Sequence, residues 1–95
     1  RSGRSLFSAE VDGERSEVVL RPLLPGADLP VNVERHVRLL RDERYRNLLF
    51  ELDLGVSWHA ELVPALLRNG FRPAILLPFA GQSDLVIFEA HATES

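Results

Sequence analysis

The chain has 95 residues, of which 45% are hydrophobic and 26% charged, the composition of one water-soluble globular domain. Its 11 basic residues are all arginine and face 14 acidic residues, so a net charge of −3 gives no general electrostatic reason to expect a nucleic-acid partner. Cysteine and lysine are both absent, which excludes disulfides, thiolate nucleophiles, thiolate metal ligands and Schiff-base chemistry.

A hairpin is predicted at the start of the chain. Residues 5–11 and 16–22 are short runs typical of strands, and Asp12-Gly13 between them is a hairpin signal because glycine accepts a positive φ. Because the sequence contains no methionine, we expect residues 1–95 to be a single domain or a fragment of a longer protein. Residues 1–4 are expected to be disordered or a remnant of cloning.

A helix and a strand follow the loop around Pro25, Gly26 and Pro30. Asn32 is predicted to cap a helix over residues 33–45, whose apolar residues recur at helical spacing. Residues 47–54 alternate and so predict a half-covered strand. One face of that strand carries Leu48, Phe50, Leu52 and Leu54, and the other carries Leu49, Glu51 and Asp53.

The last elements are a second helix and a second hairpin. Ser57 is predicted to cap a helix over residues 58–69, with an irregular start or a later first turn because Pro64 lies inside it. Residues 71–79 and 84–90 form apolar runs typical of strands covered on both faces. The predicted order is β-β-α-β-α-β-β, an α+β (α/β-like) class with a mixed, mostly antiparallel sheet and two helices.

Three side chains are candidates for proton transfer. Glu51 and Asp53 share one strand face and could act as a general base and its partner. The alternative is a face that is open to solvent or covered by a further segment. His59 stands near a predicted helix start, either as a catalytic base or in a surface or capping role.

Arginines recur along the first predicted helix. Arg35 and Arg38 are the candidates for binding a phosphate or a carboxylate, and the alternative is a solvated helix face on which neighbouring acidic residues pair with them. The three histidines are far apart in the sequence and show no short metal-ligand spacing, so no metal site is predicted.

The second half of the chain carries a family resemblance. A helix ends in "LLRNGFRP" (66–73), an apolar strand "AILLPF" follows, and "DLVIFEA" closes the sheet. With the order of the elements, these stretches resemble the C-terminal half of a GNAT-type (acyl-CoA N-acyltransferase-like) fold. The resemblance implies a sheet with helices packed on it, and acyl-CoA as the cofactor.

The chain departs from that family at the positions that carry its chemistry. The resemblance implies a glycine-rich loop that holds the coenzyme A pyrophosphate at a helix N-terminus, but residues 21–32 here contain one glycine, several prolines and Asp28. It also implies a tyrosine four residues before Gly70, as general acid, and an asparagine further upstream. Leu66 and His59 stand at those positions.

These departures decide the expected function. We expect a GNAT-like domain that is non-catalytic by itself and that associates with a second copy, binds a protein partner or completes a larger acyltransferase. The alternatives are an acyl-CoA-dependent N-acyltransferase active as an oligomer, and a small-ligand-binding α+β module. No cofactor is expected, and acyl-CoA is the one that the resemblance leaves possible. No nucleic-acid or membrane partner is expected, and a cytoplasmic bacterial location is predicted.

Overall fold

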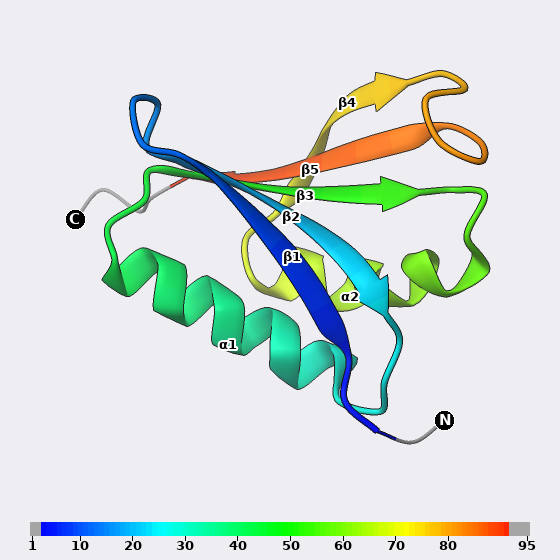
Figure 1. Cartoon of the computed structure of the whole chain (residues 1–95), viewed down its shortest axis with the longest axis horizontal. Coiled ribbons are helices and arrows are strands. Elements are labelled where there is room, and N and C mark those ends of the chain that lie inside the picture. Colours follow the sequence, from blue (N-terminus) through cyan, green and yellow to red (C-terminus); the bar gives the residue numbers. More distant parts are fainter. Residues whose placement is uncertain (1–2, 92–95) are drawn as a thin grey trace.

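A computed structural model describes residues 3–91 and confirms the predicted order of elements and the α+β class (Figure 1). The elements are β1 (Leu6–Asp12), β2 (Glu17–Leu24), α1 (Leu29–Asp42), β3 (Asn47–Asp53), the 3₁₀ helix η1 (Ser57–Leu62), α2 (Val63–Arg68), β4 (Arg72–Leu77) and β5 (Leu85–His91). The irregular start expected for the second helix is the 3₁₀ helix η1, and the α-helical turns begin beside Pro64.

The five strands form one mixed sheet in the order β1-β2-β3-β5-β4. β2 and β3 run parallel, and the other neighbouring strands run antiparallel. The pairing of β2 with β3 runs from Glu17 and Asn47 to Leu20 and Phe50 and then ends. Because β2 continues to Leu24 and β3 to Asp53, the ends of these two strands are unpaired with each other, and this divergence positions the candidate site.

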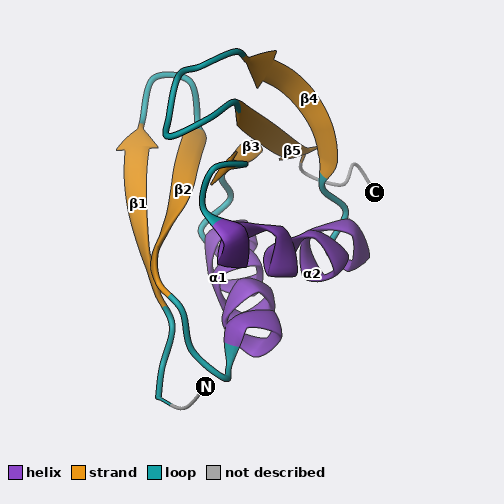
Figure 2. Ribbon diagram, turned by 90° about the vertical axis from the view of Figure 1, so that its right-hand side faces the viewer, coloured by secondary structure: helices purple, strands orange, loops and turns teal. Residues whose placement is uncertain are grey.

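Both α-helices lie on the same side of the sheet (Figure 2). The alternation predicted for the third strand is confirmed, since Leu48, Phe50 and Leu52 are buried beneath the helices. Leu54 was expected on the same face, but it lies beyond the end of β3 and is exposed. The side chains of Glu51 and Asp53 therefore point to the opposite side of the sheet.

Three aromatic rings connect the sheet to the rest of the core. Phe50 meets Phe7 edge-on at 5.3 Å between ring centroids and Phe71 edge-on at 6.2 Å. Valines and leucines of α1, η1 and α2 complete the core, namely Val33, Val37, Leu40, Leu62 and Leu66. The core therefore lies between the sheet and one layer of helices.

Gly70 ends α2 as the sequence predicts. Its φ of +88° is in the left-handed region that favours glycine. The N–H of Gly70 donates to the carbonyl of Leu67, and the N–H of Phe71 donates to that of Leu66. These bonds satisfy the last carbonyls of the helix and direct Phe71 into the core.

Three local predictions were wrong. In the first turn the positive φ belongs to Ser16 (53°) and not to Gly13, because the carboxylate of Asp12 accepts the N–H groups of Glu14 and Arg15 and shapes the turn. α1 begins at Leu29, which places Asn32 inside its first turn, where its side chain bonds to another segment. Ser57 begins η1 but makes no capping hydrogen bond.

The prediction that both strands of the second hairpin are covered on two faces was also wrong. β4 is the edge strand of the sheet, and all six of its residues are exposed. Phe79 lies beyond the end of β4, in the turn before β5. A run of adjacent apolar residues therefore does not distinguish a buried strand from an apolar edge.

Residues 1 and 2 of the expected terminal stretch lie outside the described part of the chain, and the carbonyl of Gly3 accepts the N–H of Ala27 in the loop before α1. No helix among residues 3–91 has the length and apolar character needed to cross a membrane.

Candidate functional site

A pocket of about 240 Å³ lies where β2 and β3 diverge. It is lined by Arg21, Pro22, Leu23, Glu51, Asp53, His59, Ala80, Gly81 and Leu85. The structure therefore brings together the three predicted candidates for proton transfer, Glu51, Asp53 and His59. The two carboxylates come from alternate residues of β3, and the histidine comes from η1.

The carboxylate of Asp53 is occupied by backbone donors. Its Oδ2 accepts the N–H of Gln82 (2.7 Å), and its Oδ1 accepts those of Gly55 (2.8 Å) and Ser83 (3.2 Å). These N–H groups, that of Gln82 above all, hold the pKa of Asp53 below its ordinary value. A Cβ added at Gly81 would collide with this carboxylate, so glycine is required for the close approach. Asp53 thus anchors the β4–β5 loop to β3.

His59 is fixed in one tautomer. Its Nδ1 accepts the backbone N–H of Asp53 at 2.9 Å, and because that N–H can only donate, the ring proton of neutral His59 is on Nε2. Burial lowers the pKa of His59, and the nearby carboxylate of Asp53 opposes that shift. His59 is therefore a neutral donor at the pocket wall, and its Nδ1 lone pair is already in use.

Glu51 on β3 forms an ion pair with Arg21 on β2, at the point where these two strands diverge. The Nε of Arg21 donates to its Oε2 at 3.2 Å, and a second nitrogen of Arg21 lies 3.6 Å from the carboxylate of Glu10. Arg21 thus links β1, β2 and β3. Sequence reasoning missed Arg21, because the partners of a single arginine within a strand are evident only once the order of the strands is known.

The N-terminus of α1, where the resemblance implies a phosphate site, is closed by the chain itself. The N–H of Ser5 donates to Oδ1 of Asp28 (2.6 Å), and the N–H of Ala27 donates to the carbonyl of Gly3 (3.2 Å). Asn32 Nδ2 donates to both the carbonyl (3.2 Å) and the hydroxyl (2.8 Å) of Ser5. The backbone N–H of Ser5 is the main cause of the lowered pKa of Asp28.

The residues at this helix start do not fit the pyrophosphate of acyl-CoA. A Cβ added at Gly26 would collide with the backbone of Arg4 and Ser5, so the N-terminal segment lies directly against the loop. The carboxylate of Asp28 puts a negative charge where an anionic ligand would bind. The space and the charge are both unfavourable for phosphate.

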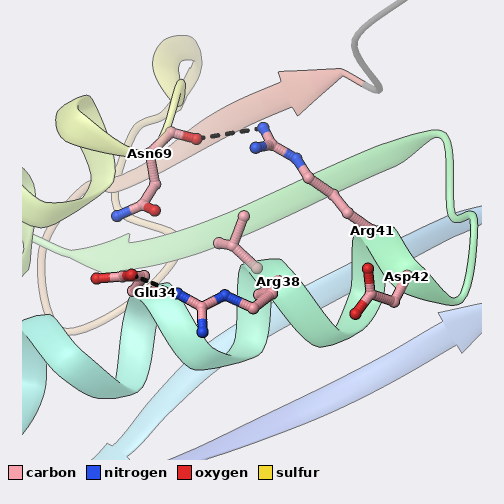
Figure 3. A pocket seen from close by; sticks show the side chains of 6 residues that line it. Glu34, Arg38, Arg41, Asp42 and Asn69 are labelled. Carbon is pink, nitrogen blue, oxygen red and sulfur yellow. Dashed lines mark hydrogen bonds and ion pairs between the residues drawn. The ribbon is translucent and has the colours of Figure 1, made fainter.

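Both arginine candidates are exposed on α1, and Arg35 lies near enough to Asp28 to help lower the pKa of that carboxyl. Arg38 donates to Glu34 at 2.6 Å, and both line a second pocket of about 340 Å³ (Figure 3). Its other lining residues are Val37, Arg41, Asp42 and Asn69. Two arginines face two carboxylates there, so the pocket has no charge excess that would select an anion. Arg35 is exposed and lines neither pocket.

No three histidine, aspartate or glutamate side chains within the described range, 3–91, are grouped so that they could hold a metal ion.

We expect His59 to make stability depend on pH. Its folded pKa lies below the ordinary value of 6.5, so the unfolded chain takes up the proton first. The contribution of neutral His59 is therefore complete above about pH 6.5 and is lost as the pH falls toward the lower folded pKa. Urea unfolding across this interval should show the decline. His59→Gln should flatten it, whereas the exposed-site control His91→Gln should retain it, and an unchanged slope in His59→Gln would contradict the assignment.

Comparisons with known proteins agree with this architecture. The sequence matches no protein-family model and no curated protein. A solved structure from Sphaerobacter thermophilus, assigned as an acetyltransferase, superposes with a TM-score of 0.62 at 21% identity, over 83% of this chain and 52% of the other. One from Desulfovibrio desulfuricans, assigned to the GNAT family of acetyltransferases, gives 0.64 at 16% identity, over 94% and 60%. The chain therefore spans little more than half of either protein, and its fold is GNAT-like.

Proposed function

We propose that this chain is a GNAT-like domain that does not transfer acyl groups by itself and acts by association, with a second copy or with the remainder of a larger acyltransferase. The observation that carries the proposal is the closed N-terminus of α1. A helix N-terminus binds phosphate through free N–H groups and its positive dipole end. Here the N–H of Ala27 is already donated to Gly3, Pro30 has none, and Asp28 is anionic.

The remaining chemistry supports the same proposal. Leu66, at the position where the resemblance implies a proton donor, is fully buried in the core and has no group that can donate. The carboxylate of Asp53 is held by backbone N–H groups, Glu51 is paired with Arg21, and Nδ1 of His59 is in use. The polar atoms of these side chains already bond to other parts of the chain, which favours a structural role over proton transfer.

The uncovered surface of the sheet supports association. The helices cover one face, whereas the opposite face and the β4 edge are not covered by any element of residues 3–91. The GNAT-like structures that it resembles are also considerably longer than this chain. Exposed strand edges and apolar surface are typical of regions that meet a further segment or a partner.

Calorimetric titration with acetyl-CoA tests the proposal. We expect no saturable heat when acetyl-CoA is added to a millimolar concentration, because the N-terminal segment lies directly against the loop before α1 and the pyrophosphate would meet the carboxylate of Asp28. The titration should be repeated at protein concentrations at which the chain associates. Saturable binding under either condition would overturn the proposal and favour the alternative, an acyl-CoA-dependent enzyme whose site is the pocket at the β2–β3 divergence.

A further inference from the structure

Phe79 is an aromatic side chain held out into solvent by a constrained backbone. Its side chain is 88% exposed, and its φ of 56° lies in the left-handed region, where a bulky residue is rare. The N–H of Phe79 donates to Oδ1 of Asp84 at 2.9 Å, which fixes the turn between β4 and β5. Residues held in sparsely populated backbone conformations cluster at functional sites, where the surrounding structure holds them in place.

An apolar groove lies on the same hairpin. It has a volume of about 220 Å³ and is lined by Pro73, Ala74, Ile75, Leu76 and Val86. The register of β4 against β5 shifts between Pro73 and Ile75, and this irregularity is part of the groove. Because Phe79 is exposed almost completely, its ring does not fill the groove of its own chain.

The form of the β4 edge favours contact through side chains and not through strand pairing. Pro73 has no N–H to donate, and the irregularity beside it interrupts the ladder. Both features are typical of edge strands that are protected against main-chain pairing. The apolar side chains of β4 nevertheless remain open, with Ile75 49%, Leu76 56% and Leu77 42% exposed.

Residues 73–79 carry no charged side chain, and the carboxylate of Asp84 beside them is bonded to the N–H of Phe79. Residues 73–79 read Pro-Ala-Ile-Leu-Leu-Pro-Phe, and the flanking Arg72 is directed to the carbonyls of Leu67 and Phe71. Aromatic anchors in apolar pockets dominate the binding energy of protein interfaces. A phenyl ring buries on the order of 150–250 Å². The aliphatic side chains of β4 increase this area toward the roughly 800 Å² that a stable interface buries on each partner.

We propose that two copies of this chain associate through the β4–β5 hairpin, with Phe79 of each copy seated in the groove of the other. The proposal rests on the proposed function and names the partner. The occupant is a second copy because the projecting ring and the groove are on one hairpin, so a two-fold axis between them satisfies both at once.

Sedimentation equilibrium on the wild-type chain and on Phe79→Gly tests this interface. Glycine relieves the left-handed φ, so the variant should fold at least as well as the wild type, which circular dichroism and urea unfolding verify. We expect a concentration-dependent dimer for the wild type and a dissociation constant at least tenfold higher for Phe79→Gly. Leu39→Ala, at an equally apolar exposed position of α1, is the matched control and should dimerise as the wild type does.

A pair of complementary variants tests the geometry. Ala74→Arg blocks the groove but keeps Phe79, whereas Phe79→Gly keeps the groove but lacks the ring. Each variant alone has no intact ring–groove contact in its homodimer, but a mixture of the two has one. Energy transfer between differently labelled chains should therefore report a heterodimer that is tighter than either variant homodimer.

A monomeric wild type, a Phe79→Gly chain that dimerises like the wild type, or a mixture that shows no complementation would each overturn the interface. None of these results bears on acetyl-CoA binding, which is measured separately by calorimetry. Conversely, saturable binding of acetyl-CoA would overturn the proposed function while a dimer that depends on Phe79 would remain. The two failures are thus distinguishable.

Discussion

Replacing Phe71 by alanine is expected to lower the free energy of unfolding by about 3–5 kcal/mol. The side chain is fully buried, and its ring meets Phe50 edge-on, with ring planes 87° apart. Phe50 in turn contacts Phe7 on β1, so the loss reaches across the sheet. For a domain of this size each 1 kcal/mol corresponds to about 4–8 °C in Tm, and urea and thermal unfolding measure both quantities.

Phe79 is the matched comparison for that experiment, because it is a phenylalanine a few residues away that is almost fully exposed. Phe79→Ala should leave the stability of the monomer nearly unchanged, measured at a concentration at which the chain does not associate. A Phe71→Ala variant that loses less than about 1 kcal/mol would contradict the assignment of this ring to the core.

Replacing Asn32 by alanine is expected to cost about 1–3 kcal/mol, the penalty for leaving a buried polar group without a partner. Asn32 and Ser5 are both buried, and the amide of Asn32 donates to the carbonyl and the hydroxyl of Ser5. Loss of these bonds should also free the N-terminal segment from α1. Hydrogen exchange should therefore accelerate at the amides of Ser5 and Ala27, which donate to Asp28 and Gly3.

A double-mutant cycle with Ser5→Ala separates this contact from general damage to the helix. The hydroxyl of Ser5 is one of the two acceptors, so the two substitutions should be less than additive. Additive costs, or an Asn32→Ala chain in which both amides keep their protection, would show that the segment is held by other contacts.

Much of the fold is readable from local pattern. The alternation of residues 47–53 gives one strand and its buried face, and Gly70 marks the end of α2 because the chain needs a left-handed residue there. The same alternation puts Glu51 and Asp53 on one face, and their meeting with His59 follows from the short connection between β3 and η1.

The rest depends on contacts between segments that are distant in the sequence. Ser5 meets Asp28 across 23 positions, and Gln82 meets Asp53 across 29, and no local signal announces either bond. The apolar run of β4 predicts a covered strand equally well, and only the order of the strands shows that it is an edge. Phe79 at a positive φ opposes its own propensity, which is why a strand was expected there.

The central claim is that the α1 N-terminus of this GNAT-like domain is filled by its own N-terminal segment. The most direct measurement is an amide NMR titration of the isotope-labelled chain with acetyl-CoA, read at Ser5, Ala27 and Asp28. We predict that these resonances stay in place at millimolar acetyl-CoA. Saturable shifts centred on Gly26, Ala27 and Asp28 would show that the ligand displaces the segment and would contradict the claim.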